Sequence, residues 1–170
     1  AGVEDGFHQD MLPVKQPLIG SDAFTPPTVD GVDPVTDIDM SFSLESRADT
    51  PARFRFDQIR LSGNDVLTLA RPADAAPGGE YFIEIVVTGD VSTTGNAIIV
   101  LEKGVYLRLF VQGNVSVGGG GFVNGSRLPV TLQLYGLDPL EGQGQRRIDL
   151  GGNAAFYGAI YAPNHEVSVV

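Results

Sequence analysis

Apolar and polar residues alternate along most of the chain after about residue 52. The alternation is clearest over 105–111, where every second residue is Val or Leu, and it recurs over 130–135. Side chains two residues apart share one face of an extended strand, so this period predicts β-strands with one face in a core. The apolar side chains that we expect inside are Leu107, Leu109, Val130, Leu132, Leu134 and Ile160.

One short phrase recurs among these strands: an apolar run is followed by glycine and then by asparagine or aspartate. It occurs at 83–90, 105–114 and 148–153, with an earlier echo at 59–64. Glycine accepts a positive φ and asparagine tolerates the left-handed region, so each pair predicts a sharp corner, and repeated corners predict a parallel β-solenoid. The same dipeptides also form hairpin turns, so an antiparallel sandwich is the alternative. The asparagines that stacked corners would align into a ladder are Asn64, Asn114 and Asn153.

The N-terminal third differs from the rest in composition. Residues 1–51 hold six of the eleven prolines, with scattered acids and little periodicity, which predicts an extended Pro-rich arm or an irregular cap. Residues 52–170 then form the β-helix domain. Two windows, 39–48 and 65–75, have helical spacing, and we expect at most one short helix there, covering the open end of the first coil.

Composition and charge exclude several classes of protein. The 170 residues suit a single domain, and the absence of cysteine excludes zinc ribbons, disulfide frameworks and thiol nucleophiles. The net charge of −10 opposes binding to nucleic acid or to anionic lipid. No apolar stretch approaches the roughly 20 residues of a membrane-spanning helix. We therefore expect no nucleic-acid partner and no direct membrane insertion.

Five segments together resemble a known family. They are 79–82, 91–96, 105–117, 132–136 and 148–164, and the last is the most distinctive. They resemble an uncharacterised β-helix domain of bacterial envelope proteins, which occurs in large surface or secreted proteins and in pilus-assembly proteins of the PilX type. The resemblance implies a right-handed parallel β-helix and an extracellular or envelope location within a larger exported protein. It implies no catalytic residues. The chain is also similar, more loosely, to the polymer-forming bactofilin solenoids.

An acidic cluster in the N-terminal third is a candidate calcium site, because calcium takes six to eight oxygen ligands. Its spacing does not match the D-x-[DN]-x-[DN]-G loop, and Pro34 interrupts it. A solvated loop is therefore the interpretation we favour, with calcium binding as the alternative. The cluster consists of Asp30, Asp33, Asp37 and Asp39.

No catalytic motif stands out. The run 118–121 is four glycines, but no Lys and Ser/Thr follow it, so it predicts a tight corner and no phosphate loop. The two histidines, His8 and His165, have no G-x-S-x-G elbow or serine partner, and we expect both at the surface. We therefore expect no enzyme activity, no cofactor and no metal site.

Stacked coils bring distant residues together, so two sets of charged side chains could still meet on one face as in glycan-cleaving solenoids. One set is Asp57, Arg60 and Asp65, and the other is Glu84 with Arg108. The same residue types occur on any solvated solenoid face, which is the interpretation we favour.

Outward aromatic side chains are the more suggestive feature, because exposed rings stack on sugars or anchor a partner. The alternative is an external stack beneath a loop or the N-terminal arm. These candidate ligand- or partner-binding residues are Tyr106, Phe110, Tyr135, Tyr157 and Tyr161.

The final segment, 166–170, has the pattern of a strand, which would leave an unpaired edge. The N-terminal arm could cover this edge, a second molecule could stack on it end to end, or further coils could continue in a longer parent, which we favour. The hypothesis from the sequence is a noncatalytic structural or interaction domain of a bacterial surface, pilus-associated or secreted protein. Its partners would be other envelope or surface proteins, or glycans. The alternatives are a glycan-binding or glycan-cleaving β-helix and a bactofilin-like polymer.

Overall fold

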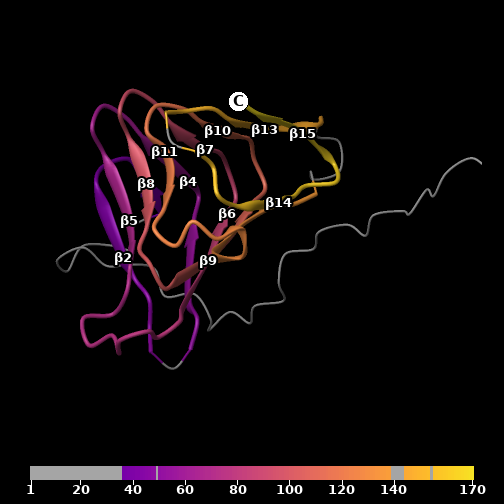
Figure 1. Cartoon of the computed structure of the whole chain (residues 1–170). Coiled ribbons are helices and arrows are strands. Elements are labelled where there is room, and N and C mark those ends of the chain that lie inside the picture. The colour runs from indigo at the N-terminus through magenta and orange to yellow at the C-terminus, as the bar shows by residue number, and fades with distance from the viewer. Residues whose placement is uncertain (1–35, 49, 139–143, 154) are drawn as a thin grey trace, which may run out of the picture.

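Three parallel sheets form the walls of a coiled chain (Figure 1). The computed structural model describes residues 36–48, 50–138, 144–153 and 155–170. The six-stranded sheet has the order β1 (Asp37–Ile38), β4 (Gln58–Leu61), β7 (Val91–Thr93), β10 (Val115–Val117), β13 (Arg146–Leu150) and β15 (His165–Val169). The four-stranded sheet has the order β11 (Gly121–Asn124), β8 (Ile98–Leu101), β5 (Val66–Ala70) and β2 (Phe42–Glu45). The five-stranded sheet has the order β14 (Ala159–Tyr161), β12 (Leu132–Gly136), β9 (Val105–Val111), β6 (Tyr81–Val87) and β3 (Ala52–Phe56).

Each coil contributes one strand to each sheet in turn. The chain passes from β4 to β5 to β6 and then returns to the six-stranded sheet with β7, which pairs in parallel with β4. In the same way β8 pairs with β5 and β9 pairs with β6, so hydrogen bonds join successive coils and never consecutive strands. The parallel β-helix predicted from the sequence is therefore confirmed, and the antiparallel alternative is wrong. The last coil has no strand in the four-stranded sheet among the described residues.

Glycines with positive φ turn the chain from the six-stranded to the four-stranded sheet. Gly63, Gly95 and Gly119 occupy this corner in three successive coils, with φ of 59°, 70° and 61°. A side chain at Gly95 would lie 3.0 Å from the carbonyl oxygen of Gly63, so the stacking distance itself requires glycine here. Beside them, Asn96 donates its backbone N–H to the Gly63 carbonyl at 2.7 Å and its side-chain amide to Asn64 at 3.2 Å.

The predicted ladder of three asparagines does not form, because they occupy two different corners. Asn114 lies where the chain returns to the six-stranded sheet, and it donates its backbone N–H to Asp90 at 2.7 Å. Asn64 lies at the opposite end of that sheet. Asn153 stacks over the glycine run 118–121, which forms a corner as predicted. A single ladder through Asn64, Asn114 and Asn153 is therefore wrong, since equal dipeptides do not identify which corner they make.

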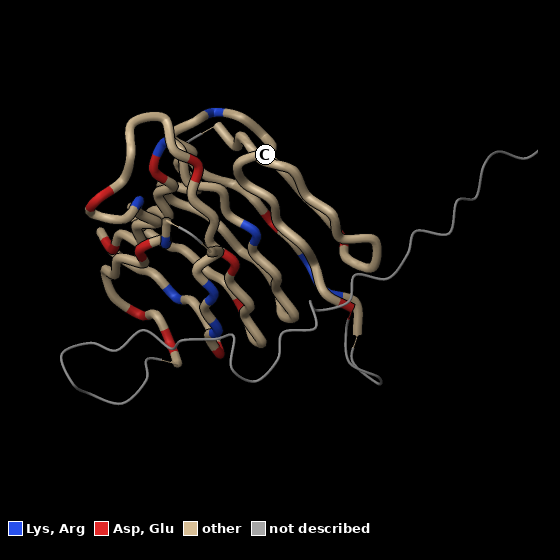
Figure 2. The backbone as a smooth tube through the Cα atoms, turned by 90° about the horizontal axis from the view of Figure 1, so that it is seen from below, with Lys and Arg blue, Asp and Glu red and all other residues tan. Residues whose placement is uncertain are grey.

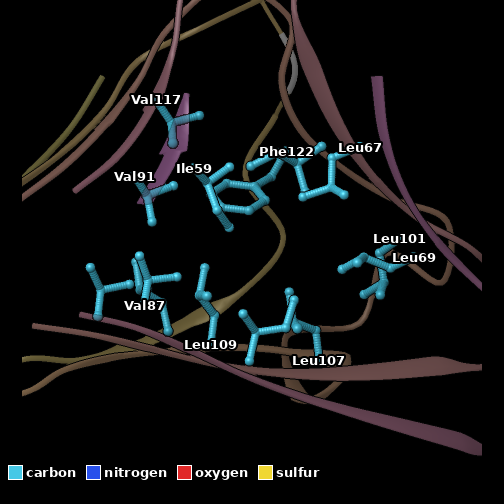
Figure 3. Packing of buried hydrophobic residues seen from close by; sticks show 14 of the residues in the cluster. Ile59, Leu67, Leu69, Val87, Val91, Leu101, Leu107, Leu109, Val117 and Phe122 are labelled. Atoms are coloured by element: carbon cyan, nitrogen blue, oxygen red, sulfur yellow. The ribbon is translucent and has the colours of Figure 1, made fainter. Parts of the chain in front are cut away.

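Apolar side chains from all three sheets fill the interior (Figure 3). Four predicted core residues, Leu107, Leu109, Leu132 and Leu134, are buried, and Ile160 is partly buried against the same cluster. Val130 was predicted inside but is 56% exposed. It lies in a 3-10 turn, η1 (Pro129–Thr131), which interrupts the alternation, so β12 begins only at Leu132.

The coils begin before the boundary expected at residue 52. β1 pairs with β4, and β2 pairs with β5, so the β-helix includes residues from 37 onward. The two windows with helical spacing contain β2 and β5, so the predicted capping helix does not form there. Residues 1–35, most of the predicted arm, lie outside the described part. Within the described part, no helix is long and apolar enough to cross a membrane.

The core predicts a clear contrast between neighbouring substitutions. We expect Leu132→Ala to lower the free energy of unfolding by about 2 to 5 kcal/mol, because it leaves a cavity in a packed interior. Val130→Ala, two residues away but exposed, should change it by less than about 0.5 kcal/mol. Urea titration of both variants measures this difference. Equal effects would contradict the assignment of Leu132 to the core.

The open end of the last coil presents apolar side chains. Val167 and Val169 pair in register with the buried Ile148 and Leu150, so they belong to the interior-facing set of β15. They are nevertheless 43% and 54% exposed, because no described strand stacks beyond β15. An exposed apolar edge strand is a template for pairing with another chain.

We expect the purified chain to self-associate through this edge in a concentration-dependent manner. Val169→Lys should weaken the association, because it places a charge in the interior-facing set. Ser168→Lys adds the same charge on the outward face of β15 and should have a smaller effect. Sedimentation velocity of the wild type and of both variants over a range of concentrations measures the association. A monomer at every concentration would contradict the expectation.

Candidate functional site

The outer face of the five-stranded sheet, here called the aromatic face, carries three rows of side chains that run across the coils. Parallel pairing in register forms each row, since residue partners in successive strands point to the same side. The first row pairs Phe82 with Tyr106. The middle row joins Arg53, Glu84, Arg108 and Gln133, and the third joins Val86, Phe110, Tyr135 and Tyr161.

The middle row is an ion-pair network around one buried carboxylate. Glu84 is 7% exposed, and its Oε2 accepts a hydrogen bond from Arg53 Nε at 2.8 Å. Its Oε1 accepts a hydrogen bond from Arg108 Nη1 at 3.2 Å. The predicted meeting of Glu84 with Arg108 therefore occurs. Both carboxylate oxygens are held by guanidinium groups, so the network ties three coils together.

The third row is an aromatic stack in which only the first ring, Phe110, is buried. Phe110 and Tyr135 stack with ring centroids 4.8 Å apart, and Tyr161 follows Tyr135 at 6.4 Å. Leu137, just after β12, packs against Phe110 together with Val86. Phe110 is consequently only 7% exposed, as in the alternative of an external stack beneath a loop.

The first row remains open to solvent. The rings of Phe82 and Tyr106 stack with centroids 4.9 Å apart, and Phe82 is 37% exposed. Tyr106 Oη donates a hydrogen bond to Glu80 Oε1 at 2.5 Å. This hydrogen bond to the neighbouring carboxylate raises the pKa of Tyr106 above its ordinary value. The orientation of the ring is thereby fixed on the sheet.

A hollow of about 580 Å³, here called the corner groove, adjoins this first row. It lies where the chain turns from the four-stranded to the five-stranded sheet. Its charged lining is balanced, with Arg71 and Lys103 opposite in sign to Glu80 and Glu102. The remaining lining residues are Gly78, Gly79, Gly104, Tyr106, Ser126, Leu128 and Thr131.

Four of the five aromatic residues predicted from the sequence therefore share one face. Tyr157 does not, because it lies beside β11, near Val123 and Arg127. Phe82 was missed, although its position between the buried Tyr81 and Ile83 gives it the outward place in the alternation. Sequence patterns do not predict the conformation of the loop that forms one wall of the corner groove, so the groove was also missed.

The acidic candidates do not converge on a metal site within the described residues, where no group of three potential ligands forms. Asp37 accepts a hydrogen bond from Gln58 Nε2 at 3.0 Å, and Asp39 is exposed outside the strands. Asp30 and Asp33 lie outside the described residues.

The first set of charged residues, Asp57, Arg60 and Asp65, does not bring its two carboxylates together. Asp57 precedes β4 and accepts a hydrogen bond from the Thr88 hydroxyl at 3.3 Å. Asp65 follows β4 and accepts the backbone N–H of Ser62 at 3.0 Å. The two carboxylates lie at opposite ends of one strand, so they cannot flank a single bond.

His165 was expected at the surface but is 8% exposed, and its burial is a second unforeseen feature. Its ring packs on Gly136, where a side chain would approach within 2.7 Å of the ring. Neither ring nitrogen has a hydrogen-bond partner among the described residues. Burial lowers the pKa of His165, while Asp138 opposes this shift and Arg146 adds to it. His8 lies outside the described residues.

The molecule is thus a parallel β-helix whose stacked coils present an aromatic and ionic outer face. A family model described as "Domain of unknown function (DUF7305)" matches residues 79–170, more than half of the chain, and the chain belongs to this family. No curated protein matches the chain, and no solved structure does.

The buried histidine predicts a pH dependence of stability. Its pKa in the folded state lies below the unfolded value of about 6.5, so below that pH the unfolded chain binds the proton more readily. We therefore expect His165 to contribute to a loss of stability as the pH falls from about 7.5 to about 5.5. Urea titrations of the wild type and His165→Leu should show the steeper loss in the wild type. An equal or shallower loss in the wild type would contradict this expectation.

Proposed function

We propose that this chain is a noncatalytic structural and interaction domain of a bacterial surface, pilus-associated or secreted protein. The observation that carries the proposal is the aromatic face, where side chains from successive coils form ordered rows above an apolar core. Such a solenoid is a rigid support for a surface that contacts other molecules. Its partners would be surface proteins or glycans.

The state of the charged groups supports a noncatalytic role. Glu84 is the one buried carboxylate among the described residues, and two guanidinium groups hold its oxygens. A general acid needs a carboxyl that can give up or take a proton at the reacting bond. Elsewhere, positive and negative residues are interspersed over the coils (Figure 2).

The envelope or extracellular location belongs to the same proposal. It is supported by the resemblance of 79–82, 105–117 and 148–164 to β-helix domains of envelope and PilX-type proteins. The net charge of −10 agrees with a role that involves neither nucleic acid nor anionic lipid.

A polymer-forming solenoid, similar to the bactofilins, is the second candidate. The observation that favours it is the exposed interior-facing set of β15, Val167 and Val169. A polymer would stack the last coil of one molecule on the first coil of the next. Growth of long filaments in electron micrographs, lost in Val169→Lys, would favour this candidate over a surface domain.

Two measurements test the main proposal. The full chain, incubated with neutral and acidic polysaccharides, should release no new sugar ends. An antibody raised against the chain should detect the native protein in the envelope fraction or culture medium of its source bacterium. Turnover abolished by Glu84→Gln would overturn the noncatalytic role, and detection only in the cytosol would overturn the location.

A further inference from the structure

A second, smaller hollow on the aromatic face lies beside the corner groove. We propose that the two together bind a neutral oligosaccharide. This inference rests on the proposed function, because it names the ligand class of an interaction domain. The second hollow has a volume of about 140 Å³ and shares Tyr106 with the corner groove. Its lining consists of Phe82, Tyr106, Leu107, Arg108, Val130 and Gln133.

The shape of this region suits an elongated ligand. The corner groove, at about 580 Å³, lies within the range of about 300 to 1,000 Å³ that is typical of small-molecule sites. Tyr106 lines both hollows, so a ligand that occupies both contacts its side chain. A chain of linked sugar rings has this form, whereas a single compact metabolite would fill only one hollow.

The open aromatic pair supplies the surface on which a sugar ring packs. Phe82 and Tyr106 stack closely, and their exposed faces lie beside the exposed side chain of Val130. The C–H face of a pyranose packs on such apolar and aromatic surface. Because Glu80 holds the Tyr106 hydroxyl, the ring loses little freedom when a ligand binds.

The polar lining suits sugar hydroxyls, which both donate and accept hydrogen bonds. Glu80 Oε1 already accepts the Tyr106 hydroxyl and Glu102 Oε2 the Arg71 backbone N–H, so each carboxylate offers its other oxygen as an acceptor. Lys103 offers donors. Ser126 Oγ accepts the backbone N–H of Gly104 at 3.2 Å, so its own hydrogen can point to a ligand. Two acidic and two basic side chains give the lining of the groove no net charge. The chain as a whole carries a net charge of −10 and repels anions, so this charge distribution favours a neutral saccharide.

Both walls of the corner groove are held by internal hydrogen bonds. In the wall after β5, Tyr81 Oη accepts the backbone N–H of Ala76 at 2.7 Å. In the wall after β11, Asn124 donates from Nδ2 to the Leu128 carbonyl at 3.1 Å and accepts the Arg127 N–H at 3.2 Å. A site whose walls are already ordered pays less entropy on binding.

The test uses calorimetric titration of the full chain with cellohexaose, xylohexaose, chitohexaose and maltohexaose. At least one should bind saturably, and the hexamer of galacturonic acid should bind more weakly because it is anionic. Phe82→Ala and Tyr106→Ala should each weaken binding about tenfold through loss of stacking. Tyr157→Ala removes an aromatic ring of similar exposure away from the aromatic face, and it should change binding less than twofold.

Two further variants keep the test decisive. Tyr106→Phe preserves the stacking surface. Glu102→Gln removes the charge of a lining carboxylate that also pairs with Arg71, with Glu45→Gln on β2 as its control. Circular dichroism and urea titration confirm folding of each variant. Failure of every neutral hexamer to bind, tighter binding of the galacturonate, or unchanged binding in folded Phe82→Ala and Glu102→Gln would each overturn the inference. None of these results bears on the noncatalytic role or the location, which the preceding measurements test separately.

Discussion

In-register stacking of the coils is the constraint on which the rest of the structure depends. Parallel hydrogen bonds set neighbouring coils about 4.8 Å apart, and every side chain then lies above its partner in the previous coil. At the corner that contains Gly95, a Cβ would lie only 3.0 Å from the Gly63 carbonyl oxygen, and the positive φ of 70° also favours glycine. Inside, the same register brings Leu107 beside Leu132, and outside it brings Phe82 beside Tyr106. The core and the aromatic face therefore have one cause.

Much of the fold could be predicted from period and corner residues. The alternation correctly predicted Leu109 and Leu134 in the core, because successive residues of a strand must point to opposite faces. It failed at Val130, where Pro129 begins a 3-10 turn and shifts the phase. The start of the β-helix was also predicted too late, since β1 and β2 are too short to show a period.

The candidate site was less predictable, because it depends on which coils stack and on how the connecting loops fold. The alternation identifies the outward aromatic residues of β9 and β12. It does not indicate that Leu137 covers Phe110. The corner groove needs the walls after β5 and β11, which have no periodic pattern. His165 shows the same limit: a lone histidine next to a turn gives no sign that Gly136 makes space for its ring.

The most direct test of this account is a measurement of which rings touch in solution. Nuclear Overhauser effects between the aromatic protons of Phe82 and Tyr106, and between those of Phe110 and Tyr135, report stacking across coils. The account predicts both sets of cross-peaks, because each pair joins strands of successive coils. Absence of both sets, together with an antiparallel ladder of backbone contacts between consecutive strands such as β5 and β6, would contradict the stacked coil and the face it builds.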